Sequence, residues 1–128
     1  MDTATLIAGF KKFVGEVLAD LKHRGLGTID AELLRLKRES LSDGLKKLKD
    51  GLADSVKKQK EKAQQTHIAR GLSNTTVLLS TFAAIDSRAA HQMVEATREY
   101  NRAIEEIALL EKRVALRSRP WWKRLWPL

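Results

Sequence analysis

The chain contains no cysteine and only two prolines among its 128 residues. Without cysteine it can form no disulfide and no thiolate metal site, and it offers no thiol nucleophile. Both prolines lie in the last nine residues, at positions 120 and 127, so no proline interrupts a helix upstream of them. The composition therefore fits a reducing compartment and permits long, uninterrupted helices.

Aromatic residues are also scarce, with three Phe, one Tyr and three Trp. Much of the apolar content is alanine and leucine instead, and the length corresponds to one domain. Such a chain is expected to form a thin core. This favours an elongated protein or a homo-oligomer over a rounded monomer.

Long hydrophobic runs are absent as well. The longest uncharged run, 71–85, has 15 residues and includes several Ser and Thr, whereas a membrane span needs about 20 mostly apolar residues. The N-terminus lacks the basic start of a signal peptide. We expect a cytoplasmic protein that is held, if at all, peripherally on the inner face of a membrane.

The usual signatures of catalysis are missing. The sequence contains no glycine-rich phosphate or dinucleotide motif and no nucleophile elbow. His91 and Glu95 are four residues apart on one predicted helix face, but no second pair accompanies them to complete a metal site. We therefore predict no enzymatic activity, no cofactor, no metal site and no small-molecule substrate.

The longest regular stretch is 73–118, which predicts one helix of about 65 Å at 1.5 Å per residue. Ser73, Asn74 and Thr75 are all good N-cap residues, and no Gly or Pro follows until Pro120. Apolar residues recur in eleven-residue steps, which predicts a straight or slightly right-handed packing seam. The residues expected to pack in this seam include Phe82, Ile85, Met93, Tyr100, Ile104 and Ile107.

Two further helical stretches precede it. Residues 3–23 carry apolar side chains at three- and four-residue steps, and Gly25 is expected to end that helix in the left-handed conformation. Thr28 or Asp30 is expected to cap the next helix. In 30–70, heptad-spaced leucines predict packing, but Gly44 favours a break and 57–65 has almost no apolar face. The packing leucines are Leu41, Leu45, Leu48 and Leu52.

Together these patterns predict an all-α fold of the elongated hairpin or bundle type with coiled-coil-like packing. Residues 1–118 are expected to form one helical domain, with helices at about 3–23, 30–42, 45–70 and 74–118. Residues 119–128 are expected to form an irregular tail. A single amphipathic helix cannot bury its apolar stripe alone, so these helices must pack on one another or on a partner helix.

Positive charge is concentrated in two blocks of the chain, whose formal net charge is +8. Residues 31–70 contain 11 basic and 6 acidic residues, and residues 113–128 contain five basic residues and no acidic one. Basic blocks attract polyanions such as nucleic acid or anionic lipid. The candidate polyanion-binding residues are Lys46, Lys47, Lys49, Lys57, Lys58, Lys60 and Lys62.

The C-terminal tail holds all three tryptophans. Indole rings interleaved with cations suit the boundary between water and an anionic membrane. The tail also fits three other uses, namely folding back onto the helices, docking into a protein pocket and stacking on single-stranded bases. The candidate binding residues are Trp121, Trp122, Lys123, Arg124, Leu125 and Trp126.

These observations predict a non-enzymatic helical adaptor or scaffold that self-associates or binds partner helices. The tail is expected to attach it to an anionic membrane surface. Two alternatives remain open. One is a basic accessory protein that binds nucleic acid through residues 35–70. The other is an assembly or secretion component whose tail docks into a partner protein.

Overall fold

A computed structural model describes residues 3–71 and 75–118, and it confirms that the fold is all-α. The described residues form three α-helices and one short 3-10 helix, with no β-strand. The first helix occupies the range that its apolar periodicity predicts. The elements are α1 (Thr3–His23), η1 (Leu26–Thr28), α2 (Ala31–Ala69) and α3 (Thr75–Ser118).

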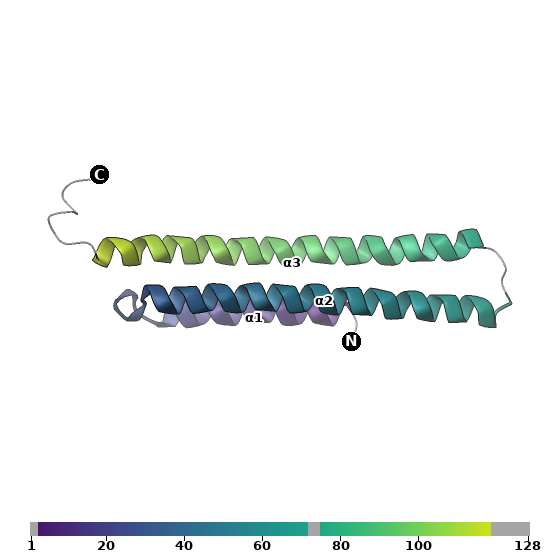
Figure 1. Ribbon diagram of the computed structural model, residues 1–128, viewed down its shortest axis with the longest axis horizontal. Coiled ribbons are helices and arrows are strands. Elements are labelled where there is room, and N and C mark those ends of the chain that lie inside the picture. The colour runs from purple at the N-terminus through teal and green to yellow at the C-terminus, as the bar shows by residue number, and fades with distance from the viewer. Residues whose placement is uncertain (1–2, 72–74, 119–128) are drawn as a thin grey trace.

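The two long helices run antiparallel, side by side, and α1 packs against both of them (Figure 1). At 21 residues α1 is much shorter than α2, which has 39, and α3, which has 44. Three helices therefore pack together over only part of the rod. Beyond the N-terminal end of α1, α2 and α3 continue as a two-helix extension, called the arm below, which comprises residues 56–69 and 75–88.

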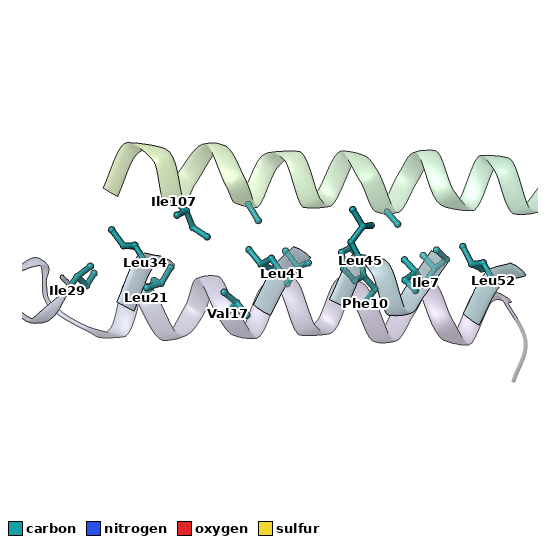
Figure 2. Close-up of a cluster of buried hydrophobic side chains, with 14 of the residues drawn as sticks. Ile7, Phe10, Val17, Leu21, Ile29, Leu34, Leu41, Leu45, Leu52 and Ile107 are labelled. Atoms are coloured by element: carbon teal, nitrogen blue, oxygen red, sulfur yellow. The ribbon is translucent and has the colours of Figure 1, made fainter. Parts of the chain in front are cut away.

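The core lies where the three helices meet, and Figure 2 shows its side chains pointing toward one another from α1 and α2, with Ile107 reaching in from α3. Burial follows helical periodicity, because only residues three or four apart share one face. The buried apolar residues include Ile7, Phe10, Val14, Val17 and Leu21 of α1, Leu34, Leu41, Leu45, Leu48 and Leu52 of α2, and Ala96, Ala103, Ile107 and Val114 of α3.

The packing seam of α3 differs from the predicted one. Its four buried apolar residues are separated by seven, four and seven positions, and two of them, Ala103 and Val114, were not predicted. Of the six residues predicted to pack, only Ile107 is buried, while Phe82, Ile85, Met93, Tyr100 and Ile104 are half-buried. Ala96 and Ala103 are fully buried at the centre of the seam, and the larger side chains at its edges are half-buried.

The predicted break near Gly44 is wrong, because α2 runs without interruption from Ala31 to Ala69. Gly44 faces α1, and a Cβ atom at this position would lie 2.8 Å from Cε1 of Phe13. The glycine therefore allows close helix packing instead of ending a helix. Residues 57–65, which have little apolar character, also belong to this continuous helix.

The ends of the helices confirm one predicted cap and contradict another. Asp30 caps α2, because its Oδ1 accepts a hydrogen bond from the backbone N–H of Leu33 at 2.7 Å. Gly25 does not adopt the left-handed conformation that was predicted. Within the described ranges only Gly71, which follows α2, has a positive φ, of 67°.

Ion pairs join the helices at the end of the bundle opposite the arm. Oδ2 of Asp20 in α1 pairs with Nζ of Lys37 in α2 at 2.9 Å and with Nε of Arg24 at 3.1 Å. Hydrogen bonds from these two cations, that from Lys37 first, lower the pKa of the Asp20 carboxyl. Arg38 of α2 pairs with Glu111 of α3, and Arg117 donates to the backbone oxygen of Ile29 at 2.6 Å. These contacts join the three helices at this end of the rod.

Candidate interaction surfaces

The tail residues that the sequence singled out lie outside the described part of the chain. They follow Ser118, the last residue of α3, in the sequence. In Figure 1, the end of α3 that leads to them is at the opposite end of the rod from the arm. The tail residues concerned are Trp121, Trp122, Lys123, Arg124, Leu125 and Trp126.

The seven candidate lysines of α2 do not form a uniform basic face. Lys58 pairs with Asp54 at 3.0 Å, and Lys60 pairs with Asp86 of α3 at 2.8 Å. Exposed acidic residues lie among the remaining lysines, namely Asp43, Asp50, Asp54 and Glu61. These four are separated by seven, four and seven positions, so they share one side of the helix. The outer surface of α2 thus alternates in sign, as is typical of a solvated helix.

A groove runs along the arm from the N-terminal end of α1. Its first part lies between Leu6 of α1 and the stretch of α2 from Gly51 to Lys62. Its second part lies between α2 and the start of α3, and Gln59 and Lys62 line both parts. Sequence reasoning did not find this groove. The signal available was the difference in length between the predicted helix 3–23 and its two partners.

Large apolar side chains are exposed on the arm. Ile68 of α2 is 67% exposed, and Leu79 and Val77 of α3 are 64% and 49% exposed. Farther along the rod, where α1 is present, the buried core residues are concentrated. The arm therefore has few buried core residues and exposes apolar surface, as Leu36, Val94, Leu109 and Leu116 do elsewhere on the rod.

A second surface, which is only partly covered, lies along α3. Phe82, Met93, Tyr100 and Ile104 are half-buried, and they are spaced at about helical intervals on one side of the helix. Within the arm, the ammonium group of Lys60 lies 5.6 Å from the centre of the Phe82 ring, which is a cation–π distance. This partly covered row of apolar side chains is called the α3 stripe below.

The remaining candidates for a site are not brought together. Glu95 pairs with Lys11 of α1 instead of facing a metal ion with His91, and the described residues include no group of three His, Cys, Asp or Glu that could hold a metal. In residues 3–71 and 75–118, no helix has both the length and the apolar character needed to cross a bilayer. Two candidate interaction surfaces on the described residues are therefore the arm groove and the α3 stripe.

Comparison of the chain with models of protein families, with curated proteins and with solved structures finds no significant match.

Proposed function

We propose that this chain is a non-enzymatic helical adaptor, which attaches to an anionic membrane surface through its C-terminal tail and presents a helix-binding surface at its other end. The observation that carries the proposal is the placement of the two ends. The C-terminal end of α3 and the arm lie at opposite ends of one rod (Figure 1). At 1.5 Å per residue, the part of α3 from residue 89 to residue 118 separates them by about 45 Å.

This separation suits an adaptor, because one end can be held on a surface while the other remains free for a partner. The tail contributes three indoles and the cations Arg119, Lys123 and Arg124. Apolar insertion and electrostatic attraction together provide the two signals that stable attachment of a peripheral protein requires. Each cation near an anionic surface contributes about 1 kcal/mol.

Vesicle co-sedimentation tests the membrane attachment. The full chain is expected to bind vesicles that contain phosphatidylserine and to lose this binding when residues 119–128 are removed. The double variant Lys123→Gln/Arg124→Gln should bind about 30-fold more weakly, since it loses about 2 kcal/mol of attraction. The matched variant Lys46→Gln/Lys47→Gln removes the same charge from α2 and should have little effect. Equal binding by the full and truncated chains would rule out the tail as the anchor.

Self-association is proposed to use the α3 stripe. Its apolar side chains are half-buried in the single chain, and an antiparallel or parallel contact with a second copy would cover them by coiled-coil-like packing. Sedimentation equilibrium is expected to show a dimer that the substitution Met93→Glu converts to a monomer, because a carboxylate in that contact would be desolvated without a partner. A chain that is monomeric at all accessible concentrations would contradict this part of the proposal.

A further inference from the structure

The arm groove lies in line with α1, beyond the N-terminal end of that helix. In the bundle, α1 fills the valley between α2 and α3, with Phe13 against Gly44 and Lys11 paired with Glu95 of α3. Leu6 then marks the beginning of the groove. From there to Arg70 the same valley has no third helix. About 15 residues of α2 line it, which corresponds to about 23 Å or four helical turns.

The groove combines an apolar floor with a rim in which basic residues outnumber acidic ones, since the one acidic residue that lines it, Asp54, pairs with Lys58. Ala63, Val77 and Leu78 contribute apolar surface, and hydroxyl and amide side chains lie among them. Lys62 and Arg70 line the groove, are exposed, and make no ion pair with any described residue. An apolar floor selects the apolar face of an amphipathic helix, and unpaired cations at its edge select carboxylates.

We propose that the arm groove binds an acidic amphipathic helix of about four turns from a partner protein. This inference rests on the proposed adaptor function and names the class of partner. The helix takes the place beside α2 and α3 that α1 takes farther along the rod. Its apolar residues pack on Leu78 and Ala63, and its carboxylates pair with Lys62 and Arg70.

The arm of a second copy does not fit the groove, because the part of α2 in the arm is basic and does not have charge complementary to Lys62 and Arg70. The buried apolar residues of α3 already pack against α1 and α2. The occupant of the groove is therefore a different protein.

Fluorescence anisotropy with two synthetic helices tests the inference on the full chain. One labelled peptide of 18 residues has leucines on one face and glutamates on the other, and its analogue has lysines in place of the glutamates. The acidic peptide is expected to bind and the basic analogue is not. The double variant Lys62→Glu/Arg70→Glu should weaken binding of the acidic peptide at least tenfold.

The control variant Lys46→Glu/Lys57→Glu changes the charge of α2 equally but lies outside the groove, and it should weaken binding less than threefold. All four substituted residues are exposed, so both variants should keep the helical fold. Absence of binding by the acidic peptide overturns the inference. Equal weakening by both variants also overturns it, since that result means general attraction of polyanions. Vesicle binding by the groove variant should be unchanged, so failure of the tail anchor and failure of the groove are separate outcomes.

Discussion

The substitution Leu41→Ala is expected to lower the free energy of unfolding by about 3 kcal/mol, which lies within the range for buried leucines. Leu41 is fully buried in the cluster that joins the three helices, and Figure 2 shows it in the row of α2 side chains that face the other helices. Removal of its three terminal carbons reduces the buried apolar area and leaves a cavity. The helices cannot close this cavity, because the neighbouring leucines hold them in place. A loss of this size is a large part of the total stability expected for one domain, about 5–15 kcal/mol.

Leu36 provides the matched control for this prediction. It belongs to the same helix, but its side chain is 48% exposed, so the change Leu36→Ala should alter the free energy of unfolding by less than about 0.5 kcal/mol. Urea denaturation followed by circular dichroism measures both variants. If Leu36→Ala costs as much as Leu41→Ala, the face of α2 assigned to the core is incorrect, or Leu36 is covered by another copy of the chain.

The sequence predicts the helices better than it predicts their contacts. The range 3–23 is clear because large apolar residues repeat at three- and four-residue steps and two glycines follow soon after its end. The leucines of α2 are equally clear because Leu34, Leu41, Leu45, Leu48 and Leu52 recur at three-, four- and seven-residue steps on one face of the helix. Strong periodicity of large residues is the signal on which such predictions depend, and both helices have it.

The seam of α3 was less predictable because its centre is made of small residues. Alanine occurs on many faces of this helix, so Ala103 does not differ in sequence from the exposed Ala83 and Ala90. Only the packing of α3 against α1 and α2 decides which alanines are buried. A prediction based on hydrophobic periodicity favours large residues such as Tyr100. In the structure these residues lie at the edge of the contact.

The candidate surfaces were predicted only in part. The tail and the lysines could be read from composition, whereas the arm groove depends on where α1 ends relative to α2 and α3. That is a tertiary relationship, which the local pattern of any one helix does not contain. The continuous helix through residues 57–65 also depends on a tertiary contact. Lys60 contacts Asp86 and Phe82 of α3, and this contact supports a stretch with little apolar character of its own.

Gly44 and Gly51 occur in a repeated Asp-Gly-Leu sequence, but the structure leaves different amounts of space for a side chain at the two positions. A Cβ atom at Gly51 would lie 3.5 Å from the two terminal carbons of Leu6, which is an ordinary contact. A Cβ atom at Gly44 would lie 2.8 Å and 3.2 Å from Cε1 and Cδ1 of Phe13. We expect Gly51→Ala to stabilise the chain by up to about 1 kcal/mol, because alanine favours the helix over glycine.

The substitution Gly44→Leu is expected to destabilise the chain by about 3 kcal/mol despite the better helix propensity of leucine, because the added side chain pushes the Phe13 ring and α1 away from α2. Removing the ring should restore the space. In a double-mutant cycle, Gly44→Leu should cost at least about 1 kcal/mol less in a Phe13→Ala background than in the original chain. If Gly44→Ala stabilises as much as Gly51→Ala and the cycle shows no coupling, α1 does not pack on Gly44, and the groove beyond its end would not continue the same valley.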